Sequence, residues 1–278
     1  MTAAQAVSGR IAQLLLPLRK DPGSSAVLCD IDGTLAPIVA DPVEAHVPPE
    51  TREALRALAR RFGLVACVSG RRAVQARSVV GVDELTYAGN HGLELLRPEA
   101  SEADLDPAVG ELARAAHDLV GELDSSSLSR VGLSLEDKGP IQALHWRTAS
   151  DQRAAERRAG EIATRAEQAG LVPHWGRKVL EIRPTNEVHK GTAVRRLLVA
   201  APVRRALFAG DDRTDFDAFD ALRAISADGG LRDAICIGVA SEEQPAGLAE
   251  RADALVEGPK ELEGVLRWLA EPRAEPGD

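Results

Sequence analysis

Short apolar runs alternate with longer amphipathic stretches over the first hundred residues of the chain. The runs at 27–31, 64–69 and 85–89 are bounded by turn-forming residues and are typical of buried strands. The stretches 49–62 and 71–80 predict helices, and the first of them begins with proline and carries acids before bases. Strands that alternate with helices in this way predict a parallel sheet covered by helices.

The middle of the chain follows another pattern. It predicts a helix, a hairpin, a second helix and a second hairpin, over residues 105–121, 131–147, 150–169 and 171–184. Ser150 is a plausible N-cap of the second helix, and Gly176 lies in the turn of the second hairpin. This order indicates an open sheet with helices on one side, and therefore a separate α+β module.

The alternation of strands and helices returns after this module. Helices are predicted at 190–199 and 261–270, and strands at 205–212, 234–240 and 252–257. We therefore expect an α/β fold whose core is interrupted by an inserted α+β cap. The expected boundaries are 1–97 and 185–278 for the discontinuous core and 98–184 for the cap.

Composition limits both the core and the partners. Of the 278 residues 44% are hydrophobic but only 3% are aromatic, so alanine, leucine and valine must fill the core. The net charge of -9 argues against a nucleic acid partner, because a phosphate backbone needs a basic face. A small phosphorylated molecule is compatible with this charge, since it needs only a few local cations.

Three cysteines, Cys29, Cys67 and Cys236, lie in separate apolar runs and form no Cys-x-x-Cys pair. We interpret them as buried thiols in a reducing compartment. No apolar run approaches the roughly 18 residues that a membrane span needs. The run at 11–18 is short, is followed by two basic residues and predicts an amphipathic helix that packs on the core. These features predict a cytoplasmic protein without a membrane partner.

Two carboxylates, Asp30 and Asp32, follow the first predicted strand, at the sheet edge where α/β proteins bind ligands. They would repel each other without a cation, so the turn is either a solvated acidic loop or part of a metal site. Three more clusters end or begin core elements, at 69–71, 190–191 and 210–212. Each alone is a common turn or a solvated side chain, but the four together favour one shared site.

The four clusters resemble the motifs of the haloacid dehalogenase-like phosphatases, matched here by DIDGT, the Ser69 turn, Lys190 and GDDRTD. The resemblance covers essentially the whole core and implies a Rossmann-like fold. It implies that Asp30 is the nucleophile and that Asp32 is the general acid and later the base. Ser69 and Lys190 would hold the phosphoryl oxygens. An acid two residues after the nucleophile is a feature of the phosphatases, not of the related ion-pumping ATPases or phosphonate hydrolases.

The same resemblance implies Mg²⁺ as the cofactor. Phosphoryl transfer spreads negative charge over oxygens, and Mg²⁺ prefers oxygen ligands. The implied ligands are the carboxylates of Asp30 and Asp211 and the backbone carbonyl of Asp32. The residues implied behind these ligands are Asp212, Asp215 and Thr34.

A second layer of motifs narrows the substrate. SGR, GNHG, an E-x-K followed by H-W-R, and EIRP occur in the order and spacing that resemble the trehalose-6-phosphate phosphatase family. Sugar hydroxyls bind to carboxylates and to Lys and Arg, which fits these residue types. The substrate-binding residues implied by this resemblance are Arg71, Asn90, His91, Glu136, Lys138, His145, Arg147 and Glu181. Of these, Glu136, Lys138 and Glu181 would bind the glucosyl unit distal to the phosphate.

Some positions have a plainer interpretation. Glu136 with Lys138 could be an exposed hairpin pair, although the matched set favours a functional role. The histidines without motif support, interpreted as structural or solvated, are His46, His117 and His174. Two positions depart from the family, Phe216 where Glu is usual and Trp146 where Tyr is commoner. Phe216 could alter the packing near the metal loop or mark a subgroup with another sugar preference.

The resemblance implies a phosphoric monoester hydrolase that converts trehalose 6-phosphate to trehalose and phosphate. One alternative is the same chemistry on sucrose 6-phosphate, glucosylglycerol phosphate or a pseudo-disaccharide phosphate. Another is a non-catalytic sugar-phosphate sensor, although a sensor needs no nucleophile. The third is an aspartate-metal glycosyltransferase, which would need neither Ser69 nor Lys190.

Overall fold

The computed structural model describes residues 7–39, 44–105, 109–185, 187–242 and 244–272. The chain divides into two compact units. Unit 1 comprises residues 1–103 and 189–278, and unit 2 comprises residues 104–188. Each unit is described by itself.

The strands of unit 1 form a sheet in the order β12-β11-β10-β1-β2-β3-β4. Its strands are β1 (Ser25–Cys29), β2 (Leu64–Val68), β3 (Thr86–Gly89), β4 (Glu94–Leu96), β10 (Arg205–Gly210), β11 (Asp233–Ala240) and β12 (Ala254–Glu257). The two-residue strand β5 (Asp104–Leu105) belongs to unit 2. The six strands from β12 to β3 pair in parallel, as the pattern predicts. β4 pairs antiparallel with β3 and was not predicted.

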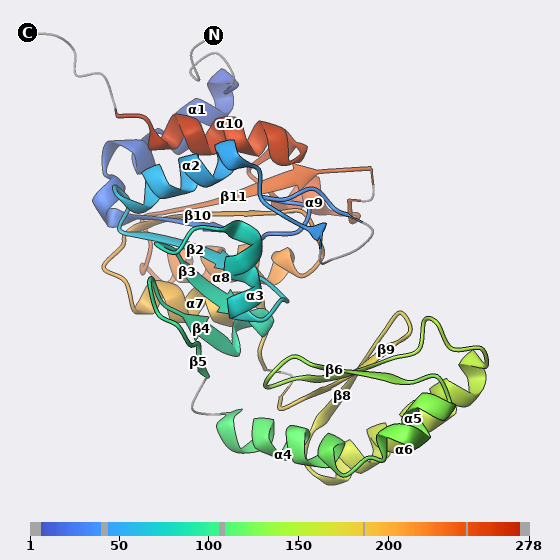
Figure 1. The fold of residues 1–278 in the computed structure, drawn as a ribbon. Coiled ribbons are helices and arrows are strands. Elements are labelled where there is room, and N and C mark those ends of the chain that lie inside the picture. Colours follow the sequence, from blue (N-terminus) through green and yellow to red (C-terminus); the bar gives the residue numbers. More distant parts are fainter. Residues whose placement is uncertain (1–6, 40–43, 106–108, 186, 243, 273–278) are drawn as a thin grey trace, which may run out of the picture. The chain divides into compact units, whose positions relative to one another are not determined.

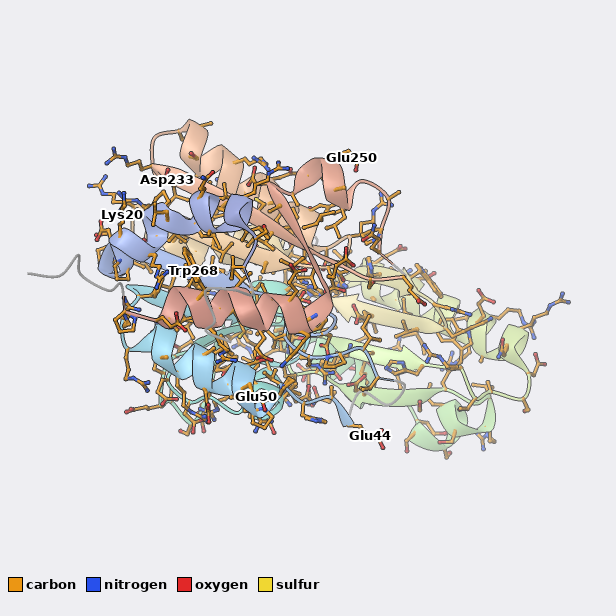
Figure 2. The ribbon with its side chains drawn as sticks, turned by 90° about the horizontal axis from the view of Figure 1, so that it is seen from above. Lys20, Glu44, Glu50, Asp233, Glu250 and Trp268 are labelled. Carbon is orange, nitrogen blue, oxygen red and sulfur yellow. The ribbon has the colours of Figure 1, made fainter. Side chains whose placement is uncertain are left out.

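Helices cover both faces of this sheet. The helices α1 (Gly9–Lys20), α2 (Pro49–Ala59), α3 (Ala73–Val80) and α10 (Gly258–Ala270) pack on one face through a single apolar cluster. Seen from above, α1, α10 and α2 lie side by side (Figure 2). The helices α7 (Lys190–Val199), α8 (Asp215–Ala227) and α9 (Leu248–Arg251) pack on the other face. Successive strand residues point to opposite faces, so β1, β2, β10 and β11 each contribute to both clusters.

Unit 2 has a four-stranded antiparallel sheet in the order β6-β7-β9-β8 (Figure 1). Its strands are β6 (Ser134–Asp137), β7 (Gln142–His145), β8 (Val172–Gly176) and β9 (Val179–Arg183). The helices α4 (Gly110–Gly121), α5 (Ser125–Arg130) and α6 (Gln152–Gln168) lie on one face of it (Figure 1). Leu144, Leu180 and Ile182 point from the strands into the apolar cluster beneath these helices.

Several predicted details are wrong. The helix predicted from residue 105 begins at Gly110, and residues 106–108 lie outside the described part of the chain. Asp151, not Ser150, caps α6, because its Oδ1 accepts a hydrogen bond from the Ala154 backbone N–H at 2.9 Å. The helices α5, α8 and α9 were not predicted.

The cysteines and the N-terminal helix agree with the sequence. Cys29, Cys67 and Cys236 are free and buried, and Cys29 lies beside Cys67 on the neighbouring strand. The predicted run 11–18 lies within α1, whose buried residues face the core. Among the described residues, no helix combines the length and apolar character that crossing a bilayer requires.

Candidate active site

Asp30 follows β1 directly and is 4% exposed. Its backbone N–H continues the strand ladder by donating to the Ala209 carbonyl at 2.9 Å. The chain then turns at Gly33, whose φ is 86°. A Cβ at Gly33 would lie 2.1 Å from an Asp211 oxygen, so only glycine allows this close approach. Thr34 Oγ1 donates to Asp211 Oδ1 at 2.7 Å, which joins the first and the fourth motif.

Lys190 is the first residue of α7 and connects three carboxylates. Its Nζ lies 2.8 Å from Asp30 Oδ1, 2.7 Å from Asp215 Oδ1 and 3.6 Å from Asp212 Oδ1. The Lys190 side chain is 3% exposed, so its ion pairs with the buried Asp30 and Asp215 are shielded from water. A lysine at this depth is not a solvated first-turn residue, which was the plainer interpretation.

Asp215, in the first turn of α8, organises the fourth motif. Its side chain is fully buried, and its Oδ2 accepts hydrogen bonds from the backbone N–H groups of Asp211 and Asp212, both at 3.0 Å. A Cβ at Gly210 would lie 2.3 Å from Asp215 Cγ, so glycine is needed where the strand ends. Asp212 Oδ1 in turn accepts from the Asp215 backbone N–H at 3.2 Å. These hydrogen bonds fix the conformation of the turn between β10 and α8.

Burial controls the electrostatics of this cluster. Desolvation raises the pKa of Asp30 to about 7, although Lys190 opposes the shift. Burial likewise raises the pKa of Asp211 to about 6, and it raises the pKa of Asp215 as well. Burial opposes the charge of Lys190, but the carboxylates outweigh it and raise the Lys190 pKa. The site therefore holds more buried negative charge than one ammonium group can satisfy.

A divalent cation fits this arrangement. Asp30, Asp211 and Asp215 each offer an oxygen, and these oxygens lie within 4.8 Å of one another. Hard carboxylate ligands suit a cation such as Mg²⁺. Asp215 already uses both oxygens, for Lys190 and for two backbone N–H groups, so it is better placed to support the ligands than to be one.

Asp32 is held by Arg71. Arg71 Nε and Nη2 donate to the two Asp32 oxygens, both at 2.7 Å, in the bidentate geometry that guanidinium groups favour. The Arg71 backbone N–H donates to Ser69 Oγ at 3.1 Å. Arg71 was predicted to contact the sugar, and its contact with the expected general acid is an additional role that the sequence did not indicate.

We expect Arg71→Lys to lower kcat at least about tenfold for alkyl phosphates, because a lysine cannot hold both Asp32 oxygens. The effect should be smaller for an aryl phosphate with an acidic leaving group, which needs less protonation. The measurement is phosphate release from both substrate types. Arg72→Lys, at a side chain that is 40% exposed, is the matched control. Equal losses on both substrates would contradict a role through Asp32.

Asn90 and His91 follow β3 and have positive φ angles of 48° and 60°. Their backbone N–H groups donate to the Arg71 and Ser69 carbonyls at 2.7 and 2.9 Å. The His91 ring lies against Gly70, where a Cβ would come within 2.9 Å of it. The predicted residues of the second motif and of GNHG are therefore packed together.

Glu94 is a buried residue of this region to which no role was predicted. Its side chain is 8% exposed, and its Oε2 accepts from the Ala73 backbone N–H at 2.8 Å, at the start of α3. The one sequence feature that could have indicated Glu94 is an acidic residue inside a strand-like run. Glu94 positions the helix that follows Arg71.

Phe216 does not join the acidic cluster. Its ring packs against Phe219, with centroids 6.5 Å apart, and the Arg251 guanidinium lies 4.9 Å above it. The departure from the family pattern is therefore accommodated by packing within the second apolar cluster of unit 1.

In unit 2, the predicted sugar-binding residues form two charged groups. Glu181 Oε1 accepts from Lys138 Nζ at 2.9 Å, and Arg183 Nη2 lies 2.6 Å from Glu181 Oε2. His145 Nε2 lies 2.9 Å from Glu136 Oε2. The Arg147 side chain is exposed and makes no hydrogen bond or ion pair with another residue in the described part of the chain. The structure thus brings four of these five predicted residues into contact with another ionisable side chain.

We expect Glu181 to make unit 2 sensitive to acid. Burial alone would raise the pKa of Glu181, but Lys138 and Arg183 outweigh it and lower the pKa from 4.5 to about 2. The ionised carboxylate therefore stabilises the fold fully above about pH 4.5, and this stability is lost as the pH falls towards 2. The lost contribution is about 3 kcal/mol.

Two of the three tryptophans, Trp146 and Trp175, lie in unit 2, and Trp268 lies in unit 1. Tryptophan fluorescence of a Trp268→Phe background during denaturation therefore follows unit 2. The Glu181→Gln protein should show a smaller loss of stability between pH 5 and 2 than the unchanged chain. Glu122→Gln, at a side chain that is 70% exposed, is the control. Identical acid profiles for Glu181→Gln and the unchanged chain would contradict the prediction.

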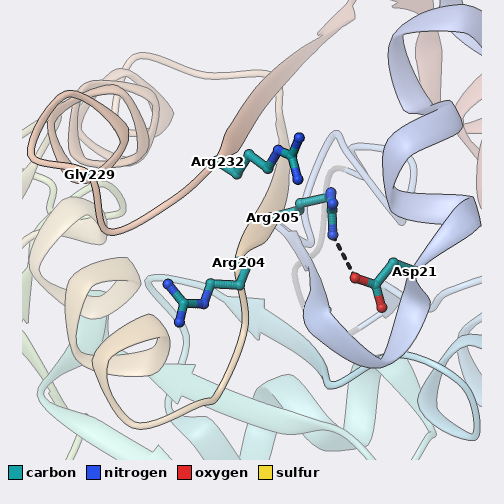
Figure 3. A pocket seen from close by; sticks show the side chains of 5 residues that line it. All are labelled: Asp21, Arg204, Arg205, Gly229 and Arg232. Atoms are coloured by element: carbon teal, nitrogen blue, oxygen red, sulfur yellow. Dashed lines mark hydrogen bonds and ion pairs between the residues drawn. The ribbon is translucent and has the colours of Figure 1, made fainter.

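A separate cavity of about 340 Å³ lies at the amino ends of β10 and β11. Its lining residues are Asp21, Arg204, Arg205, Gly229 and Arg232, and Arg205 Nη1 donates to Asp21 Oδ2 at 2.7 Å (Figure 3). No predicted site residue lines it, because the predicted residues of unit 1 follow the carboxyl ends of β1, β2, β3 and β10 or, for Lys190, begin α7. The cavity is therefore distinct from the candidate active site.

Comparison with known proteins identifies the family. The model of the trehalose-phosphatase family matches residues 28–248. A probable trehalose-phosphate phosphatase 9 from Oryza sativa is 36% identical over 228 residues, which cover 71% of this chain and 59% of the relative. A trehalose-phosphate phosphatase from Mycobacterium avium is 38% identical over 212 residues, which cover 71% of this chain and 51% of that relative.

Comparison with solved structures also finds a similar fold. The C-terminal domain of the trehalose-6-phosphate phosphatase of C. albicans superposes with a TM-score of 0.68 at 22% identity, covering 94% of this chain and 96% of that domain. This likeness confirms the predicted α/β fold with its inserted α+β module. The chain spans between about half and three-fifths of the length of the two curated relatives named above. By its sequence match, the chain belongs to the trehalose-phosphatase family.

Proposed function

We propose that this protein is a Mg²⁺-dependent phosphatase that hydrolyses trehalose 6-phosphate to trehalose and phosphate. The observation that carries the proposal is the meeting of all four motifs in unit 1, with Lys190 Nζ 2.8 Å from Asp30 and Arg71 bidentate on Asp32. Membership of the trehalose-phosphatase family supports the choice of substrate.

Asp30 attacks the phosphorus and forms an aspartyl-phosphate, while the sugar oxygen leaves. Asp32, oriented by Arg71, donates a proton to that oxygen. Asp32 then takes a proton from water, which attacks the phosphorus and releases Asp30 and phosphate. Ser69 and Lys190 bind the phosphoryl oxygens and stabilise the charge of the transition state.

Mg²⁺ would be held by the carboxylates of Asp30 and Asp211 and by the backbone carbonyl of Asp32, with Asp215, Asp212 and Thr34 behind them. When bound, it offsets the repulsion between the nucleophile and the phosphoryl group. Three buried free thiols suit a reducing compartment, so we place the reaction in the cytoplasm.

In unit 2, Glu136, Lys138, His145, Arg147 and Glu181 select the sugar. Glu136→Ala or Glu181→Ala should then lower kcat/KM for trehalose 6-phosphate and leave a small aryl phosphate nearly unaffected. Equal losses on both substrates would contradict sugar selection by these residues.

The test of the function is phosphate release with Mg²⁺ from trehalose 6-phosphate, sucrose 6-phosphate, glucose 6-phosphate and glucosylglycerol phosphate. We expect a preference for trehalose 6-phosphate of at least about a hundredfold, or roughly 3 kcal/mol in transition-state binding. Preference for another compound would keep the mechanism and change the substrate. No turnover of any compound would favour a sugar-phosphate sensor.

Removal of the metal provides a separate prediction. Dialysis against a chelator should abolish phosphate release, because the buried carboxylates of Asp30 and Asp211 would then face the phosphoryl group without a divalent cation. Activity should return on addition of Mg²⁺ but not of Na⁺ at equal ionic strength. Full activity of the dialysed protein would contradict a metal-dependent mechanism.

A further inference from the structure

The sheet of unit 2 has one face that its own helices do not cover (Figure 1). Residues directly opposite each other in antiparallel strands point to the same face. The register pairs Glu136 with Ala143, Ala143 with Glu181 and Glu181 with His174. These four residues therefore form one row across the sheet, and Leu135, Leu144, Leu180 and Trp175 form the neighbouring row on the helix-covered face.

His174 is the end of this row, on the outer strand β8. Its side chain is exposed, and it makes no hydrogen bond or ion pair with any residue that the structure describes. Its neighbours in the row are already engaged, since Glu181 is bound by Lys138 and Arg183 and Glu136 by His145. His174 is thus a free hydrogen-bonding side chain next to the carboxylate expected to bind the sugar.

Partial desolvation on the sheet, and the nearby charge of Arg183, lower the pKa of His174. The imidazole is therefore neutral near pH 7, with one nitrogen that donates and one that accepts. Such a group complements a sugar hydroxyl, which also donates and accepts. A directly opposite pair in antiparallel strands has Cβ atoms about 4.5–5.5 Å apart, so one sugar ring can reach both Glu181 and His174.

We propose that His174 is a specificity-determining residue that hydrogen-bonds a hydroxyl of the same sugar unit as Glu181. This inference rests on the proposed function, and it adds a residue that no sequence motif indicated. Only the register of the strands indicates His174, because it is seven residues from Glu181 along the chain but directly beside it across the sheet.

The test compares His174→Leu and His174→Asn in steady-state kinetics with the preferred sugar phosphate of the panel and with a small aryl phosphate. A single neutral hydrogen bond changes binding by about 2-fold to 12-fold. We therefore expect His174→Leu to raise KM for the sugar phosphate within that range with kcat nearly unchanged, which is the pattern for lost uniform binding. His174→Asn should restore much of the affinity, since its amide both donates and accepts.

Neither variant should alter the aryl phosphate kinetics or the melting temperature. His117→Leu, an exposed histidine of α4, is the matched control and should leave all constants unchanged. An unchanged KM in His174→Leu, or no recovery in His174→Asn, would overturn the assignment while the proposed function stood. If the unchanged chain hydrolysed the aryl phosphate but no sugar phosphate, both the proposed substrate and this assignment would be wrong.

Discussion

The Asp30→Asn protein should release phosphate at least about a thousandfold more slowly than the unchanged chain, because an amide cannot form the aspartyl-phosphate. Its fold should persist. Asparagine has nearly the same shape, and Lys190 keeps its ion pair with Asp215 at 2.7 Å. Since burial raises the pKa of Asp30 to about 7, loss of its charge should cost little stability. The measurement is single-turnover phosphate release together with a melting curve.

Asp217→Asn is the control for this substitution, as it changes an exposed acid of α8 in the same way. It should retain the rate of the unchanged chain. Release by the Asp30→Asn protein at a rate close to normal would reject the nucleophile assignment and favour direct attack by water.

The Lys190→Met protein should lose both stability and activity. The substitution leaves the carboxylates of Asp30 and Asp215 buried, 6% and 0% exposed, without their shared cation. Removing one partner of a buried ion pair typically costs about 3–5 kcal/mol. In a protein of this size that corresponds to a fall in melting temperature of at least about 6 °C. Phosphate release below the new melting temperature should fall at least about a hundredfold, since a phosphoryl-binding cation is gone.

Arg195→Met provides the comparison for Lys190→Met, because it removes an exposed cation from the same helix α7. Its melting temperature should change by less than about 2 °C. A Lys190→Met protein as stable as Arg195→Met would show that the carboxylates are satisfied without the lysine, for example by a tightly bound metal ion.

Some features of this protein depend on local sequence alone. The strands β1, β2 and β10 end at or directly before Asp30, Ser69 and Gly210, where apolar runs give way to turn-forming residues. The polarity of neighbouring residues is enough to predict these strands. The helix α7 begins at Lys190 as predicted. The helix α8 was missed because the acids Asp215 and Asp217 at its start resemble a polar loop. The cap of α6 is Asp151, one residue after the predicted Ser150. Polarity patterns locate the end of a helix only to within one or two residues.

The order of residues along the chain was enough to predict the α/β class, the inserted module and the residues that meet in the candidate site. Tertiary structure decided the partners of those residues. Lys190 and Asp215 are 25 positions apart and Arg71 and Asp32 are 39 apart, and only the folded sheet brings their atoms within 2.7 Å. His174 meets Glu181 only through the register of β8 and β9. Polarity patterns are local along the chain, whereas contacts and burial are set by packing between distant segments, and burial in turn sets the pKa values of the site.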